Sequence, residues 1–307
     1  MFFIIAPETR SCYILNMDDQ DIYYIDGEFV EASKAVIPVN DLALLRGYGV
    51  FDFLRTYGRK PFCIEEHVSR LKNSAWLIGL LFPWTVDEVI GIVNRIVSLN
   101  HHVESNIRII VTGGPSADFI TPDNDPRLLV LAGELHSCPR EWYSQGVKVI
   151  TVPGCRSIPG AKTINYLSAI VSLELARSRE AVEAISIDQN GMVGEGQTAT
   201  VFAFIGDRMV TNEDGILPGV TRALILQLTE SEFPREIREL PVAELLRADE
   251  IFMTASNKEV FPVVRVDETV IYDGTPGPHT RKVMKLFRDY TNRFALGNFK
   301  LATKALR

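Results

Sequence analysis

The chain has 307 residues and a formal net charge of -7. This length is sufficient for two domains with separate hydrophobic cores, and the apolar and charged fractions are those of an ordinary globular protein. Nucleic-acid binding depends on clustered Lys and Arg, which this acidic sequence lacks. The composition therefore argues against a nucleic-acid surface, but it leaves room for a small anionic ligand in a local arginine pocket.

Cysteine usage and hydropathy favour a cytoplasmic enzyme. Cys12, Cys63, Cys138 and Cys155 are scattered without CxxC spacing, so they indicate neither a metal site nor a disulfide framework. The N-terminal MFFIIAPE is apolar at its start, but it lacks a basic flank and is too short for a signal peptide. No later run is long enough to span a bilayer. We therefore expect reduced thiols and no membrane partner.

The first half of the chain has the pattern of an α+β fold. Two hairpins are expected, because each has β-prone runs around a glycine-containing turn, and two segments have helical periodicity. The expected elements are hairpins over 22–36 and 50–62, turning at Asp26-Gly27 and Tyr57-Gly58, helices over 65–80 and 86–99, and buried strands over 107–112 and 128–132.

Residues 134–146 lose periodicity and gather polar residues and a proline, so we place an interdomain linker there. It separates an N-terminal small domain, residues 1–133, from a larger C-terminal domain, residues 147–307. In chain order, the second domain is expected to hold a strand at 147–152, a helix after Lys162, strands at 183–188, 199–205 and 208–210, a helix opening at LPGVTR, a strand at 250–254 and a helix over 280–293.

Lys162 stands in an unusual place for a solvated cation. It lies between a Pro/Gly-rich bend, PGCRSIPGA, and a helical run with apolar residues at Leu167, Ile170, Val171 and Leu175. Helix N-termini carry positive partial charge and favour anions, so a protonated lysine gains nothing there. A surface loop is the ordinary interpretation of one lysine taken alone. A functional interpretation therefore needs support from other segments.

Three short motifs in the second half are suggestive only in combination. Glu195 lies between two glycines, where a flat ligand could approach the backbone, although a solvated hairpin tip is the commoner interpretation. In LPGVTR a Pro-Gly turn opens a helix and leaves N–H groups free at Val220 and Thr221, which suits a phosphate. Ser256 and Asn257 follow a buried strand and could donate to the same phosphate, or simply form a turn.

The helix predicted over 65–80 carries His67, Arg70 and Ser74 on one face. Arg70 could direct its guanidinium fork at an anion, or it could be an ordinary surface arginine. We expect His67 to be structural, because no second histidine is placed to complete a catalytic triad or a metal site.

The order of these motifs along the chain indicates a function more specifically than any single motif does. An arginine on a helix, a lysine before a helix, GEG, LPGVTR and a Ser-Asn turn before EVFPV follow one another as in the fold-type IV pyridoxal-phosphate enzymes. Over about Tyr24 to Tyr290 the chain resembles the class-IV aminotransferases, which include branched-chain and D-amino acid aminotransferases and aminodeoxychorismate lyases. The resemblance implies a two-domain α+β enzyme with a smaller N-terminal α/β domain and a larger, β-barrel-like C-terminal domain with flanking helices. It also implies pyridoxal 5'-phosphate and a homodimer.

The resemblance assigns cofactor roles. Lys162 matches the lysine that forms the Schiff base and moves a proton between the substrate Cα and the cofactor C4′, which needs an amine that is neutral part of the time. Glu195 matches the carboxylate that pairs with the pyridinium nitrogen. Tyr166 resembles the tyrosine near the cofactor's phenolic oxygen in branched-chain enzymes. The residues that match the phosphate cup are Arg70, Val220, Thr221 and Ser256, with Asn257 a looser candidate.

Substrate recognition is where the sequence departs from the family patterns. Gly113, in VTGGPS, stands where D-amino acid enzymes carry a carboxylate-trapping arginine. Ile107-Arg108 is similar to the Ile-Arg pair of bacterial branched-chain enzymes, but Asn106 replaces the tyrosine usually found two residues before that arginine. The familiar ways of holding a substrate carboxylate are therefore only partly present.

The segment RGYGVFDFLR supplies further candidates, Arg46 and Arg55, and it places Phe51 where many relatives have a pocket-lining aromatic residue. We expect Arg108, Arg46, Arg55 or backbone groups to hold the substrate carboxylate. The predicted enzyme transfers an amino group between an amino acid and a 2-oxo acid such as 2-oxoglutarate. Branched-chain L-amino acids are the leading substrates and D-amino acids the close alternative. An aminodeoxychorismate lyase, or a cofactor-binding protein without turnover, remains as a further alternative.

Overall fold

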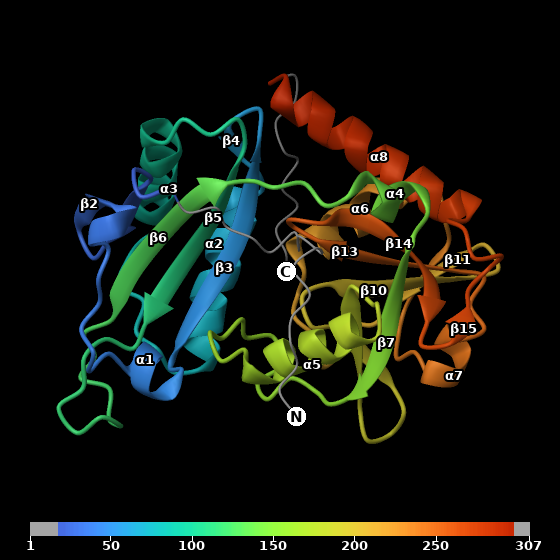
Figure 1. Ribbon diagram of the computed structural model, residues 1–307, viewed down its shortest axis with the longest axis horizontal. Coiled ribbons are helices and arrows are strands. Elements are labelled where there is room, and N and C mark those ends of the chain that lie inside the picture. Colours follow the sequence, from blue (N-terminus) through green and yellow to red (C-terminus); the bar gives the residue numbers. More distant parts are fainter. Residues whose placement is uncertain (1–17, 298–307) are drawn as a thin grey trace.

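The computed structural model describes residues 18–297, so the MFFIIAPE segment and Cys12 lie outside the described residues. The described chain forms two lobes, each built around one sheet (Figure 1). No helix within these 18–297 positions combines the length and apolar character needed to cross a membrane.

The first lobe is an antiparallel sheet with helices packed on one face. Its elements are β1 (Ile22–Ile25), β2 (Glu28–Glu31), the 3-10 turn η1 (Ala32–Lys34), α1 (Leu42–Arg46), β3 (Gly49–Tyr57), β4 (Lys60–Pro61), α2 (Ile64–Leu77), α3 (Val86–Leu99), β5 (Ser105–Thr112) and β6 (Arg127–Glu134). The strands run in the order β2-β1-β6-β5-β3-β4. Val68 and Leu71 of α2 and Val93 of α3 share one buried core with Leu54 and Ile109 of the sheet.

Side-chain burial alternates along β3, so its two faces have different surroundings. Asp52 and Leu54 are fully buried, whereas Phe51 and Phe53 are only partly buried. Successive side chains of a strand point to opposite faces, so one face of β3 packs under the helices and the other is available to a ligand. The antiparallel register places Phe53 opposite Arg108 of β5.

The second lobe is a mixed sheet that curls into a half-barrel (Figure 1). Its elements, with the short helix that precedes them, are α4 (Arg140–Ser144), β7 (Val147–Pro153), α5 (Leu167–Ser178), β8 (Glu183–Ile187), β9 (Val193–Gly196), β10 (Thr200–Ile205), β11 (Arg208–Thr211), α6 (Val220–Leu228), β12 (Arg235–Ile237), α7 (Val242–Leu245), β13 (Glu250–Ala255), β14 (Glu259–Val266), β15 (Thr269–Val270) and α8 (Pro278–Ala295). The strand order is β12-β11-β10-β13-β14-β7-β8-β9, with β15 paired to β14. Helices α6 and α8 cover a core that includes Phe202, Phe252 and Phe287.

Most predicted elements are confirmed within a residue or two, and α3 matches its predicted limits. The hairpin-tip interpretation of Glu195 is wrong, because residues 193–196 form strand β9 and pair with β8. The segment 134–146, predicted as a linker, contains the short helix α4. The residues after the Ser256-Asn257 turn form a long buried strand, β14, which is absent from the predicted elements.

Candidate active site

A cavity of about 520 Å³ lies between the lobes and is lined by both of them. This volume is typical of small-molecule sites. All but two of the predicted site residues line it. Those that do are Phe51, Arg70, Arg108, Lys162, Tyr166, Glu195, Val220, Thr221, Ser256 and Asn257. Segments far apart in the sequence therefore meet at one place.

The two exceptions are Arg46 and Arg55, and they correct the expectation that either one reaches a bound substrate. Arg46 ends the short helix α1, is exposed and donates from Nη1 to the carbonyl of Leu45 at 2.8 Å. Arg55 donates from Nη1 to Glu259 Oε1 at 3.2 Å, and its guanidinium carbon lies 4.1 Å from the ring centroid of Tyr57. Arg108 is thus the predicted carboxylate-binding arginine that lines the cavity.

Lys162 is held by its backbone and presents its amine to the cavity. Its carbonyl accepts from the N–H of Phe51 at 2.9 Å, and its own N–H donates to Ser74 Oγ at 3.0 Å. The Nζ amine donates to Tyr166 Oη at 3.2 Å and lies 4.5 Å from the ring centroid of Phe51. The rings of Phe51 and Tyr166 meet edge to face at 5.2 Å. The bend before α5 therefore fixes the lysine against the first lobe.

Glu195 is a buried carboxylate that forms an ion pair with Arg156. Its Oε1 accepts from Arg156 Nε at 2.6 Å, and its Oε2 accepts from the N–H of Leu217 at 3.2 Å. Arg156 also donates to the carbonyl of Ala161, next to Lys162. Burial lowers the pKa of Arg156, but the Glu195 carboxylate and Tyr166 together raise it above the ordinary value. The sequence patterns do not predict this role for Arg156, although it lies in the PGCRSIPGA bend.

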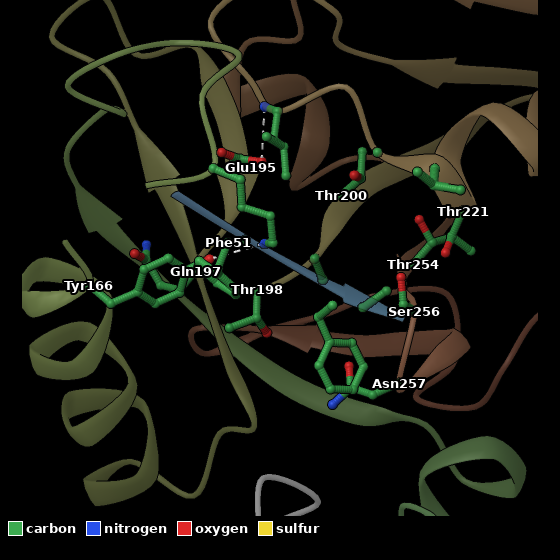
Figure 2. Close-up of a pocket in the computed structure, with 18 of the residues that line it drawn as sticks. Phe51, Tyr166, Glu195, Gln197, Thr198, Thr200, Thr221, Thr254, Ser256 and Asn257 are labelled. Carbon is green, nitrogen blue, oxygen red and sulfur yellow. Dashed lines mark hydrogen bonds between the residues drawn. The ribbon is translucent and has the colours of Figure 1, made fainter. Parts of the chain in front are cut away.

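The opposite end of the cavity offers hydroxyl and N–H donors. Figure 2 shows Thr221, Thr254 and Ser256 on the side away from Glu195 and Tyr166. Gly219 caps α6 without a side chain, so the first N–H groups of that helix lack helical partners. Within residues 18–297 the buried Thr254 Oγ1 has no hydrogen-bond partner. A side chain at Gly219 would place its Cβ 2.9 Å from Thr200 Oγ1. This end can therefore hold a phosphate.

Arg70 reaches the cavity as part of a buried cluster. Its Nε and Nη2 each donate to Asp52 at 2.8 Å, and its Nη1 donates to the carbonyl of Pro218 at 3.1 Å. Nη2 also lies 3.4 Å from His67 Nδ1. Asp52 therefore occupies one full edge of the guanidinium, and only part of its five N–H groups is available to an anion.

Asp52 and His67 complete this cluster. His67 Nδ1 lies 2.7 Å from Asp52 Oδ1. Burial alone raises the pKa of Asp52, but Arg70 and His67 hold it well below the ordinary value. Burial lowers the pKa of His67 in spite of Asp52, so the imidazole is neutral near pH 7. The expectation of a structural His67 fits this position.

Arg108 marks a third region of the cavity. Burial lowers its pKa, and its Nε is buried without a hydrogen-bond partner in the part of the chain that the structure describes. Its guanidinium carbon lies 5.8 Å from the ring centroid of Phe53. The lining around it includes the apolar side chains of Phe51, Phe53, Ile110, Leu135, Ile164, Ile170 and Leu173. This region can accept an apolar group beside a negative charge.

Comparison with known proteins agrees with this geometry. Residues 49–266 match the model of the family described as amino-transferase class IV. A D-alanine aminotransferase of Staphylococcus epidermidis is 31% identical over 274 residues, covering 87% of this chain and 96% of that protein. A putative branched-chain-amino-acid aminotransferase of Methanocaldococcus jannaschii is 29% identical over 283 residues, covering 89% and 97%. A solved structure described as the T.th. branched-chain amino acid aminotransferase with pyridoxamine 5'-phosphate superimposes with a TM-score of 0.83 at 26% identity, covering 89% and 94%.

The chain therefore belongs to the class IV aminotransferases, enzymes of fold type IV that use pyridoxal 5'-phosphate. The cavity fits that cofactor, because it joins a lysine amine, a buried carboxylate and a set of phosphate donors in one space. The Thr254 hydroxyl, which has no hydrogen-bond partner among the described residues, also lies in this lining. The predicted family, fold class, enzyme class and cofactor are thus confirmed.

Proposed function

We propose that the enzyme transfers an amino group between branched-chain L-amino acids and a 2-oxo acid such as 2-oxoglutarate. The observation that carries the proposal is the lining of the cavity, where Arg108 lies among apolar side chains. A branched aliphatic chain fits an apolar wall, and a carboxylate fits a desolvated guanidinium. The description of the solved structure above, and the name of the M. jannaschii relative, support the same substrate class.

Five of the lining residues receive cofactor and proton-transfer roles in this proposal. When bound, the cofactor supplies an electron-withdrawing ring that stabilises negative charge at the substrate Cα. Lys162 Nζ would take the proton from the substrate Cα and deliver it to the cofactor C4′, and Tyr166 Oη, 3.2 Å away, orients that amine. Glu195 holds the ring nitrogen. Arg156 positions Glu195 through their 2.6 Å contact, and the N–H and hydroxyl of Thr221 hold the phosphate.

The remaining lining residues complete the phosphate and substrate contacts. We assign the phosphate also to Val220, Ser256 and Arg70, with Asn257 at the edge of this group. Arg108 holds a substrate carboxylate and Phe51 packs against the substrate side chain. The alternation of β3 and β5 supports this assignment, because it directs Phe51, Phe53 and Arg108 to the same face.

D-amino acids are the second candidate. The S. epidermidis relative named D-alanine aminotransferase favours them, since it is 31% identical to this chain over 87% of its length. Gly113 counts against them, because the resemblance to D-amino acid enzymes requires an arginine at that position. The stereochemistry of the substrate therefore distinguishes the two candidates.

The experiment is a half-reaction panel of L- and D-amino acids, followed by the visible spectrum of the purified holoenzyme. We expect L-leucine, L-isoleucine and L-valine to bleach the cofactor band, and borohydride to fix the cofactor on Lys162. Arg108→Ala should weaken substrate binding, whereas Arg95→Ala, an exposed arginine of α3, should not. Conversion of D-alanine with no response to L-leucine would replace the first candidate with the second.

We also propose that the enzyme is a cytoplasmic homodimer with domains at 1–133 and 147–307. The exposed apolar residues of α5 support the dimer, since Leu167, Ile170 and Val171 are 70%, 56% and 61% exposed in the single chain. Separate hydrophobic cores in the two lobes support the division. Cys63 and Cys155 form no disulfide in the part of the chain that the structure describes, which supports a reducing compartment. Light scattering tests the dimer, and a monomeric mass would refute it.

A further inference from the structure

The backbone of Lys162 is bonded to the first lobe on both sides of the residue. Its carbonyl accepts from Phe51 N–H of β3 at 2.9 Å, and its N–H donates to Ser74 Oγ of α2 at 3.0 Å. Two residues later, Ile164 N–H donates to the carbonyl of Gly49 at 3.1 Å. The direction of the lysine side chain therefore depends on groups more than eighty residues earlier in the chain.

Of the three hydrogen bonds just described, the one from Lys162 N–H to Ser74 is the one that uses a side chain. The Ser74 hydroxyl is fully buried, accepts from Lys162 N–H and donates to the carbonyl of Arg70 at 2.8 Å. Back-bonding of a serine to its own helix slightly destabilises the helix, so that bond alone gives no reason for a buried serine. The hydrogen bond that Ser74 accepts from Lys162 N–H does give a reason, because a buried N–H without a partner costs stability.

Arg70 extends the same helix face toward the other end of the cavity. It lies one turn before Ser74, and its Nη1 donates to the carbonyl of Pro218, which directly precedes the Gly219 cap of α6. The guanidinium is held by Asp52, which His67 also contacts. One face of α2 thus contacts both the lysine segment and the phosphate segment, through two separate side chains.

We propose that Ser74 is a positioning residue for Lys162, acting separately from the phosphate contacts. This inference rests on the proposed role of Lys162. The covalent link to the cofactor forms when the Nζ amine attacks the aldehyde carbon and one water leaves. Ser74 fixes the peptide from which that amine extends, and it does not line the cavity itself. Its loss therefore affects the link and leaves phosphate binding intact.

The test compares two probes on cofactor-free protein. Pyridoxal 5'-phosphate can link to Lys162, whereas pyridoxine 5'-phosphate carries an alcohol in place of the aldehyde and can only bind. We expect Ser74→Ala to weaken pyridoxal phosphate binding by about 3- to 10-fold, the effect of one lost hydrogen bond, with pyridoxine phosphate affinity unchanged. Unchanged pyridoxine phosphate affinity also shows that the variant is folded.

Two control variants define the outcomes. Ser98→Ala removes an exposed serine of α3 that back-bonds to Arg95 at 2.7 Å, and it should change neither affinity. Asp52→Asn releases one edge of Arg70 and should weaken both probes. Equal weakening of both probes by Ser74→Ala, or no weakening of either, would overturn the positioning role. A wild-type protein that takes up no pyridoxal phosphate would instead refute the proposed function.

Discussion

A fully buried lysine, Lys258, lies one residue beyond the Ser256-Asn257 turn. Its Nζ donates to Glu183 Oε2 at 2.9 Å and to Thr198 Oγ1 at 2.8 Å, and both charged side chains have 0% exposure. Thr198 lines the cavity, and so does Asn257. The pair therefore joins the start of β8, the β9–β10 connection and the β13–β14 turn. We predict that Lys258→Met destabilises the protein strongly.

The magnitude follows from the burial of both charges. Removing one partner of a buried pair leaves the other uncompensated, which costs about 3–5 kcal/mol. At roughly 2 °C per kcal/mol for a chain of this size, the melting temperature should fall by about 6 to 10 °C. In the double variant Lys258→Met with Glu183→Leu no charge remains. Its stability should therefore recover to within about 2 kcal/mol of wild type.

Calorimetry of the cofactor-free proteins measures these differences. Lys148→Met is the matched control, because Lys148 pairs with Glu268 at 3.1 Å with side-chain exposures of 20% and 84%. Loss of such a surface pair should change stability by at most about 1 kcal/mol. The reasoning fails if Lys258→Met melts with wild type, or if the added Glu183→Leu change restores nothing.

Two further predictions concern the site. The pKa of His67 is lowered by burial, so as pH falls through about 6.5 the unfolded chain gains a proton there that the folded protein does not bind, and stability falls. In His67→Gln the loss of unfolding free energy between pH 7.5 and 5.5, measured with urea, should be smaller, and an unchanged loss would contradict this. Arg156→Leu leaves the buried Glu195 without its cation, so the cofactor-free protein should lose about 3 kcal/mol. Added pyridoxal phosphate should reduce this deficit, while the exposed Arg140→Leu should show none; equal deficits with and without cofactor would argue against Glu195 at the ring.

Local signals explain which parts of the fold could be predicted. Helix α3 has a Thr85-Glu88 capping box and a regular apolar stripe, so both its ends could be located. The expected hairpin tip at Glu195 is wrong because Gly194 and Gly196 indicate a turn locally. In the structure these glycines admit close neighbours in a strand, since a Cβ at Gly196 would lie 2.3 Å from Met253 Cε. Long-range packing therefore decides the conformation of GEG.

The charged groups that support the site could not be predicted, because they are isolated in the sequence. Arg156 and Lys258 lie in segments that the sequence analysis singles out, but nothing in those segments indicates their partners Glu195 and Glu183, which lie 39 and 75 residues away. Arg55 alternates along β3 in step with Phe51 and Phe53, which line the cavity, but its side chain bonds Glu259, a residue distant in the chain. Order and spacing of motifs could find the groups on the cavity wall. The ion pairs behind that wall depend on tertiary contacts alone.

Strand β3 is the element on which the two parts of the site depend together. Its main chain bonds the lysine segment through Gly49 and Phe51, and its side chains alternate between Asp52, which holds Arg70, and Phe51 and Phe53, which line the cavity. A slip of one residue would exchange these faces. It would bury the aromatic rings, expose the Asp52 carboxylate and release Arg70 in a single step. The register of β3 therefore determines both where Lys162 is held and what surrounds its amine, so the site depends on pairing within the first lobe as much as on the motifs of the second.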